Sequence, residues 1–226
     1  MKYGAKGAKW APMATEGTAI VKPTYGEALE FDGLNEFSET LNMATGSAYG
    51  DNQEKIFISE FSNGEGTVKA VFIPYEVSEA ILGTTGDNEG GLEYHEDDNQ
   101  PFGAYGFYRT LMDAKKNKFY EVNFYPKVQG SIEGSTSKTK EDGVTLEYDS
   151  IKLRIQSCNN GTFKIEKRFN KETEAIKYLA GLFDGTSAWP REKKEGQTNQ
   201  DSSVGENGEN TADGSAEGKE EQEVTA

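Results

Sequence analysis

The chain has 226 residues, with 24 Lys and Arg against 39 Asp and Glu, and a formal net charge of −15. So acidic a protein is not expected to hold phosphate backbones tightly, because nucleic-acid affinity depends on contacts between cations and phosphates. A single cysteine and a single histidine exclude an intramolecular disulfide, thiolate-rich metal sites and most catalytic designs that need an imidazole. No run of about 18 apolar residues occurs, so no membrane anchor is expected.

Three parts of the chain differ in composition. Residues 1–17 mix Gly, Ala and Lys around Trp10 without a periodic pattern, and we expect an N-terminal arm that depends on a larger body for order. Residues 187–226 contain ten acidic and four basic side chains and few apolar ones, which predicts a disordered acidic tail. The part between them, 18–186, is long enough to bury a hydrophobic core and is expected to be one domain.

The first half of this domain has a dominant period of two, which is typical of strands with unlike faces. Short strands are predicted at 18–22, 27–31, 34–42, 55–61 and 67–73. The Asn63-Gly64 pair lies between two apolar runs and is a hairpin signal. Val77 and Ile81 follow at helical spacing, and Gly83 comes after them, so a short helix is predicted over Tyr75–Leu82.

Residues 83–101 are rich in glycine and acidic side chains and predict a solvated loop. Their spacing does not match a helix-loop-helix calcium site, so no metal is expected there. His95 lies in the same loop without a second imidazole, and Cys158 is expected to be a small buried residue without chemistry. No phosphate-binding glycine motif and no nucleophile with its base is found, so we expect neither a cofactor nor an enzyme.

The clearest alternation runs from Lys118 to Ser137 and predicts a long two-faced strand. Pro126 cannot donate a ladder hydrogen bond, so a bulge, a bend or an edge is expected there. A change of parity at Asp149-Ser150, between the apolar residues at 144–148 and those at 151–155, predicts a second bulge. Aromatic residues on both faces suggest that a partner subunit covers the second face.

A second helix is predicted after Asn170, which is the expected N-cap, and it ends at Gly185. Its buried face is expected to contain Ile176, Leu179, Ala180 and Phe183. The predicted fold class is therefore mainly β (α+β), a β-sandwich with a packing α-helix.

Four segments carry a resemblance in combination: PTYGEALEF at 23–31, GAYGFYRT at 103–110, NKFYEVNFYPKVQ at 117–129 and RFNKETEAIKYL at 168–179. Together they resemble the major tail protein, or tail tube protein, of long noncontractile-tailed phages of Gram-positive bacteria, over about residues 18–183. The resemblance implies a subunit of stacked hexameric rings, whose long hairpins form a lumen-lining barrel through which DNA passes without tight binding. It also implies a tape-measure protein and tail terminator and distal tail proteins as partners, a place in the virion, and assembly in the host cytoplasm.

The geometry of such a barrel is workable. If six subunits each give about four strands, roughly 24 strands spaced ~4.8 Å and tilted ~40° close a barrel about 48 Å wide. A negative wall would keep DNA from adhering. The expected lumen-facing residues are Glu36, Ser38, Thr40, Glu121, Asn123, Gln129, Ser131 and Glu133. The expected inter-ring contacts, from the arm and from a glycine-rich loop at 43–53, are Trp10, Met43, Tyr49 and Gln53.

Other interpretations remain open from the sequence. The lumen candidates could instead be ordinary outward faces of a sandwich. A tube protein of a contractile tail, of a phage-derived bacteriocin or of a secretion apparatus would show the same patterns. A carbohydrate-binding β-sandwich would need an aromatic platform, and the two tryptophans, Trp10 and Trp189, lie outside the predicted strands. A hydrolase that uses acidic pairs is disfavoured by the lack of a nucleophile and of a second histidine.

Overall fold

The computed structural model describes residues 1–87, 89–131 and 147–191, of which 1–190 form one compact unit. The fold is mostly β: of these described residues, 56% lie in strands of antiparallel sheets and 13% in helices. The predictions for Glu133, for the strand pattern at 132–137 and 144–146, and for the acidic tail beyond residue 191 lie outside the described residues. Within these residues, no helix has the length and apolar character needed to cross a membrane.

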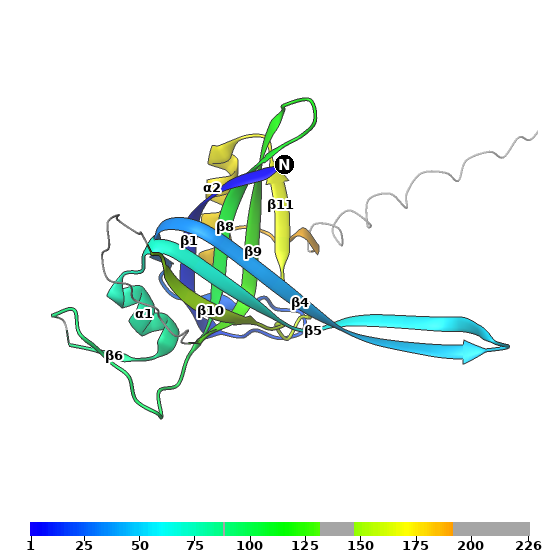
Figure 1. Cartoon of the computed structure of the whole chain (residues 1–226), viewed down its shortest axis with the longest axis horizontal. Helices are drawn as coiled ribbons and strands as arrows, with labels where there is room; N and C mark the ends of the chain where they lie inside the picture. Colours follow the sequence, from blue (N-terminus) through cyan, green and yellow to red (C-terminus); the bar gives the residue numbers. More distant parts are fainter. Residues whose placement is uncertain (88, 132–146, 192–226) are drawn as a thin grey trace, which may run out of the picture. The chain divides into compact units, whose positions relative to one another are not determined.

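One large antiparallel sheet organises this unit (Figure 1). Its strands are β1 (Lys2–Thr15), β2 (Thr24–Tyr25), β3 (Leu29–Glu30), β4 (Asp32–Gly50), β5 (Gln53–Phe72), β8 (Phe102–Met112), β9 (Lys118–Ser131), β10 (Asp149–Ile155) and β11 (Ile165–Phe169). The strand order is β2-β1-β8-β9-β10-β5-β4, with β3 also paired to β1 and β11 also paired to β9. Two short strands in the predicted loop, β6 (Thr85–Gly86) and β7 (Leu92–Glu93), pair with each other.

The first hydrophobic core lies between the β1-β8-β9 part of the sheet and the β10-β5-β4 part, which gives a sandwich-like arrangement. Phe37 of β4 packs across it, with ring centroids 5.1 Å from Tyr105 and 5.3 Å from Tyr125. Helix α1 (Tyr75–Leu82), found at its predicted bounds, adds Val77 and Ile81 to this core.

The second core lies on the other face of β1, β8 and β9 and is covered by helix α2 (Glu172–Phe183). Phe124 of β9 meets Phe183 of the helix edge-on at 5.1 Å. The aromatic second face is therefore covered by the same chain, and the expectation of a covering partner subunit at this face was wrong.

Helix α2 departs from its prediction in two details. Its N-cap is Lys171, which makes no side-chain capping hydrogen bond, so Asn170 does not cap it. Ile176 and Ala180 are exposed, whereas Leu179 and Phe183 are buried as predicted. The helix turns Ala175 and Tyr178 toward the sheet instead, and the Tyr178 hydroxyl donates to the Ala188 carbonyl at 3.1 Å.

The N-terminal segment is a sheet strand rather than the expected arm. Strand β1 pairs with β8, and its register shifts around Lys6. Gly4 and Gly7 both have φ of 63°, a left-handed conformation that interrupts the period of two and hides the strand from the sequence. At the other end, Trp189 is buried at 4% exposure, so the folded unit extends past residue 186.

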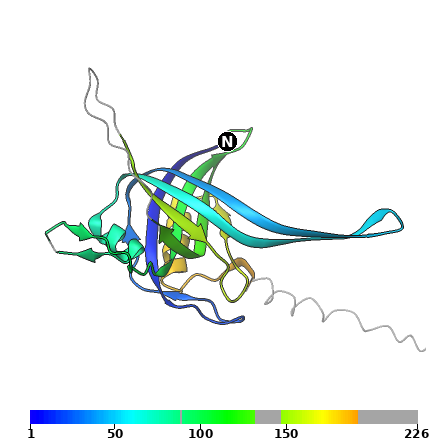
Figure 2. The same cartoon turned by 60° about the horizontal axis from the view of Figure 1, so that its bottom comes forward.

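Strands β4 and β5 form one long hairpin (Figures 1 and 2). The predicted turn at Asn63-Gly64 is wrong, as is the predicted loop at 43–53. The turn lies at Asp51-Asn52, whose φ values of 53° and 60° fit a tight two-residue hairpin turn. Gly64 is needed for close approach instead, since a Cβ there would lie 2.9 Å from Leu41 Cδ2.

Two further local predictions can be compared with the structure. The bulge at Pro126 is confirmed, because Gly103 pairs with Val128 but Tyr105 pairs with Tyr125, which leaves one extra residue on β9. The strand predicted at 18–22 is absent, since this segment forms a turn in which the Thr18 amide donates to the Val21 carbonyl.

Candidate functional site

Five of the predicted lumen residues lie on one exposed face of the main sheet. Ser131 of β9 pairs with Lys152 of β10, Lys152 pairs with Thr67 of β5, and Thr67 pairs with Ser38 of β4. Paired residues of antiparallel strands point to the same face, so this row crosses four strands. We define the polar face as Glu36, Ser38, Thr40, Glu65, Thr67, Lys69, Gln129, Ser131, Ser150, Lys152 and Arg154.

The polar face results from strict alternation along these strands. On β10, Lys152 and Arg154 are exposed, while Ile151, Leu153 and Ile155 enter the first core. On β5, Val68 and Ala70 are buried, whereas Glu65 is exposed and Thr67 and Lys69 are half-buried. On β4, Ser38 and Thr40 are exposed, and Phe37, next to Ser38, packs on the first core. The structure thus brings Glu36, Ser38, Thr40, Gln129 and Ser131 to one face of the sheet.

The charge of this face differs from the expected negative wall. Its cations are Lys69, Lys152 and Arg154, against the carboxylates Glu36 and Glu65. Lys69 Nζ lies 2.9 Å from Glu36 Oε2, and Arg154 pairs in register with Glu65. Among the described residues, this face is therefore mixed and nearly neutral rather than strongly negative.

Glu121 and Asn123 are not on the polar face. They are 2% and 0% exposed, on the same side of β9 as Tyr125, which belongs to the first core. Their prediction as lumen residues was wrong because the odd positions of β9 change surroundings along the strand. The odd positions before the bulge at Pro126, such as Glu121, face the interior, and the odd positions after it face away from the core, with Ser131 exposed.

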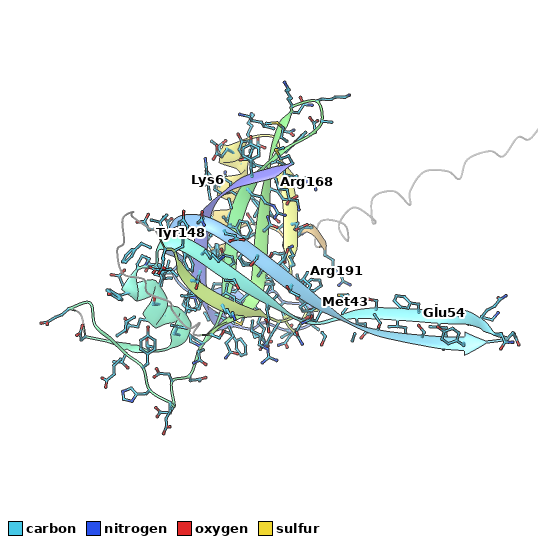
Figure 3. All side chains as sticks on the ribbon, viewed as in Figure 1. Lys6, Met43, Glu54, Tyr148, Arg168 and Arg191 are labelled. Carbon is cyan, nitrogen blue, oxygen red and sulfur yellow. The ribbon has the colours of Figure 1, made fainter. Side chains whose placement is uncertain are left out.

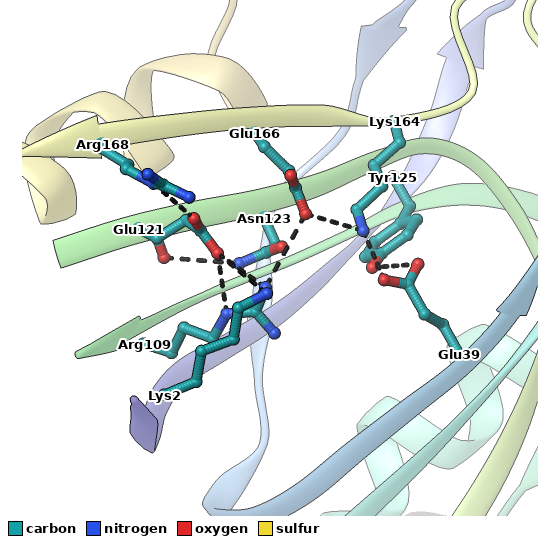
Figure 4. Close-up of polar contacts among 9 residues, drawn as sticks. All are labelled: Lys2, Glu39, Arg109, Glu121, Asn123, Tyr125, Lys164, Glu166 and Arg168. Carbon is teal, nitrogen blue, oxygen red and sulfur yellow. Dashed lines mark hydrogen bonds and ion pairs between the residues drawn. The ribbon is translucent and has the colours of Figure 1, made fainter. Parts of the chain in front are cut away.

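Glu121 is held by two arginines (Figure 4). Arg109 donates to its Oε1 at 2.9 Å from Nε and 2.6 Å from Nη2, and Arg168 Nε donates to Oε2 at 2.9 Å. Burial opposes ionisation of this carboxyl, but the hydrogen bonds from Arg168 and Arg109 outweigh it and lower the pKa of Glu121. The ionised carboxylate therefore ties β8, β9 and β11 together.

A second group of charges continues this network toward β4 (Figure 4). The Tyr125 hydroxyl donates to Glu39 Oε2 at 2.8 Å, and Lys164 contacts both Glu39 and Glu166, the latter at 2.8 Å. Within the part of the chain that is described, no group of three or more His, Cys, Asp or Glu side chains could hold a metal ion. The network acts as a polar cross-link between strands.

The predicted inter-ring residues fall into two groups. Trp10 is completely buried in the first core, so it cannot contact another ring, and this prediction was wrong. Met43, Tyr49 and Gln53 are all exposed on the β4–β5 hairpin.

Sequence reasoning missed the apolar residues that accompany them on β5. Ile56, Phe57 and Ile58 are more than half exposed. Their apolar run predicts the strand at 55–61, and no local signal distinguishes a buried strand from an unpartnered one.

The outer part of this hairpin has no neighbouring strand within the described chain. Strand β10 pairs with β5 only from Gly64 to Ala70, so residues 43–61 form a bare two-stranded ribbon. Strand β4 is the terminal strand of the sheet order and contains neither Lys nor Pro along its 19 residues. Long edges of this kind pair readily with other chains, and an isolated two-stranded hairpin is marginally stable by itself.

Cys158 is a buried free thiol, which confirms the predicted burial, and this burial raises the pKa of the thiol to about 12. A scan against protein-family models and a search of curated proteins found no match for the chain. The function is therefore inferred from the polar face, the bare hairpin and the resemblance of the sequence motifs.

Proposed function

We propose that this chain is a structural virion protein that self-assembles into stacked hexameric rings and forms the tail tube of a phage, the conduit for genome delivery. The observation that carries the proposal is the polar face, which is four strands wide and backed by a hydrophobic core. A sheet with one polar and one apolar side is suited to line a water-filled channel, because the polar side can remain hydrated while the apolar side packs inward.

The width of the polar face agrees with the barrel geometry. Strands β9, β10, β5 and β4 contribute to it, which is the number assumed for each subunit. Six such subunits give roughly 24 strands and a barrel about 48 Å wide between backbones. After ~10 Å is subtracted for inward side chains, a duplex on the order of 20 Å wide can pass.

Ring closure would use the two ends of this four-stranded segment. At one end, β4 offers its free edge. At the other end, Gly130 and Ser131 of β9 pair with β10 on one side. Strand β8 pairs with β9 only as far as Gln129, so the other side of Gly130 and Ser131 has no partner within the described residues. Pairing of β4 with this end of the next subunit would satisfy the free edge of Gly130 and Ser131 and the part of β4 beside it, and closed pairing of this kind lowers the aggregation hazard.

The mixed charge of the polar face suggests how DNA could pass without tight binding. Two of the three cations on this face, Lys69 and Arg154, have the carboxylates Glu36 and Glu65 as cross-strand neighbours, and a paired cation offers less to a phosphate. In place of repulsion by a negative wall, we propose a nearly neutral, hydroxyl-containing surface. The tape-measure, tail terminator and distal tail proteins are the partners that this function requires.

Negative-stain electron microscopy of the purified full chain tests the proposal. Rings or tubes of constant bore are expected, whether the parent tail is noncontractile, contractile or part of a bacteriocin or secretion apparatus. A species that stays monomeric at high concentration would contradict the proposal. A matched control is Ile176→Asp, because Ile176 is exposed on α2 and far in sequence from the polar face, so this variant should still assemble.

The carbohydrate-binding alternative is less well supported. Trp10 and Trp189 are both buried, so neither can form the aromatic platform that sugar recognition would use.

A further inference from the structure

We infer that the tip of the β4–β5 hairpin of one copy docks into an apolar pocket beside the β8–β9 turn of a second copy. The inference rests on the proposed self-assembly, because the partner is another copy of this chain. It adds an acceptor site on a part of the surface that neither the polar face nor ring closure uses.

The docking element is the exposed tip of the hairpin. Tyr49 and Phe57 are 72% and 62% exposed. Phe57 pairs in register with Ser47, which lies two residues before Tyr49 on β4, so the two rings share one face of the ribbon. On the same face, the Ser47 hydroxyl donates to Glu54 Oε1 at 2.9 Å. The tip thus presents two aromatic rings beside a carboxylate.

The acceptor is a cavity of about 300 Å³ where β1, β8 and β9 meet. It is lined by Met1, Lys2, Leu111, Met112, Asp113, Phe119 and Arg168. Four of these side chains are apolar and two are cationic. An engineered apolar cavity of about half this volume holds a benzene ring, so one aromatic side chain would fit.

The two surfaces have opposite charge. The hairpin segment 43–61 contains the acids Asp51, Glu54 and Glu60 against Lys55, which leaves −2. The pocket and the adjoining turn contain five cations, namely Lys2, Lys115, Lys116, Lys118 and Arg168, against Asp113, which leaves +4.

The turn lysines are the important part of this positive charge. Lys2 and Arg168 already face the buried carboxylate Glu121, whereas Lys115, Lys116 and Lys118 are exposed on the turn. A local cationic surface on a chain of net charge −15 would attract the acidic tip of another copy.

The tip and the pocket of one copy lie far apart within the folded unit. Figure 3 places Glu54 near the end of the hairpin and Arg168 on the main body of the fold, away from that end. A contact between two different surfaces of one kind of chain is heterologous, so a docked pair of copies keeps one free pocket and one free tip. Such a contact propagates from copy to copy, as stacking into a tube requires.

Disulfide trapping tests the contact in the full chain. The variant Tyr49→Cys with Met112→Cys should give a ladder of cross-linked chains on a non-reducing gel after mild oxidation. The matched control, Tyr49→Cys with Tyr94→Cys, places the second cysteine on a tyrosine that is also exposed but lies in the 83–101 loop. Cys158 is buried and should not contribute. No ladder, or equal ladders in both variants, would overturn the inference.

Charge exchange gives a second readout. The pair Asp51→Lys and Glu54→Lys should weaken association about tenfold or more, as should the pair Lys115→Glu and Lys116→Glu, because each places like charges in contact. The chain with all four changes should regain association, because the charges of the tip and the turn are then exchanged. The control Glu76→Lys, at an exposed residue of α1, should leave association unchanged. Absence of recovery in a folded fourfold variant would contradict the inference.

These outcomes separate the inference from the proposed function. If tubes form but no tip-to-pocket ladder is found, the docking contact is overturned and the proposed tube function still stands. A specific ladder in open chains that never form rings would support the contact and contradict the tube.

Discussion

The segment after α2 should stabilise the fold through one buried tryptophan. Trp189 is 4% exposed and belongs to the second core. Its segment is fixed to the helix, since the Ser187 amide donates to the Gly181 carbonyl at 2.7 Å and the Ser187 hydroxyl to the Tyr178 carbonyl at 3.2 Å. A chain that ends at Thr186 loses all of these contacts, whereas a chain that ends at Arg191 keeps them.

The size of the effect follows from this burial. A buried tryptophan covers 150–250 Å² of surface, worth roughly 4–6 kcal/mol at about 25 cal/mol per Å². Measured truncations of buried tryptophan to alanine cost about 3–5 kcal/mol. In a domain of this size, each kcal/mol lowers the melting temperature by about 2–4 °C, so a decrease on the order of 10 °C is expected.

Thermal unfolding followed by circular dichroism compares the full chain, the chain ending at Arg191 and the chain ending at Thr186. The first two should melt together, because both contain the whole compact unit at 1–190. The chain ending at Thr186, and Trp189→Ala in the full chain, should both melt about 10 °C lower. Equal melting of all four proteins would show that the second core does not depend on Trp189.

Three further experiments probe separate parts of the compact unit. Glu121→Gln should cost about 1–3 kcal/mol at pH 7 in urea unfolding. Because folding lowers the pKa of Glu121, its contribution to the free energy of unfolding is present above about pH 4.3 and is lost as the pH falls through the folded pKa. The unfolding free energies of the wild type and the variant should therefore converge in acid. A difference between them that stays constant down to about pH 2 would contradict this. Gly130→Ala should cost about 1–3 kcal/mol, because its Cβ would lie 2.2 Å from Ile81 Cγ2, whereas Gly46→Ala, which meets nothing within 4 Å, should cost nothing. Cys158 should not react with a thiol reagent at pH 8 in the folded protein and should react once urea unfolds it, since burial raises its pKa to about 12.

Local signals in the sequence predicted the elements that obey a simple period. Helix α1 was found at its predicted bounds, and the bulge at Pro126 followed from the missing amide of proline. The parity of β4 and of the end of β9 was also sufficient to select the exposed residues Ser38 and Ser131. Each of these features depends on only a few neighbouring residues.

The features that the sequence did not predict depend on long-range contacts. Asn63-Gly64 has the composition of a turn, but its glycine serves the close approach of β4 and β10. Strand β1 lacks periodicity because two glycines adopt positive φ within it. The parity of β9 predicts Glu121 as a lumen-facing residue, and only the pairing of β9 with β8 and β11 brings two arginines to it. A period along one strand contains no information about which strand lies beside it.

High-resolution electron cryomicroscopy of the assembled protein is the most direct test of the central claim. A six-fold ring is expected in which Ser38, Thr67, Lys152 and Ser131 face the bore and β4 pairs with the β9 end of the next subunit. An assembly whose bore is lined by helix α2, or a particle in which the polar face lies on the outside, would contradict the account.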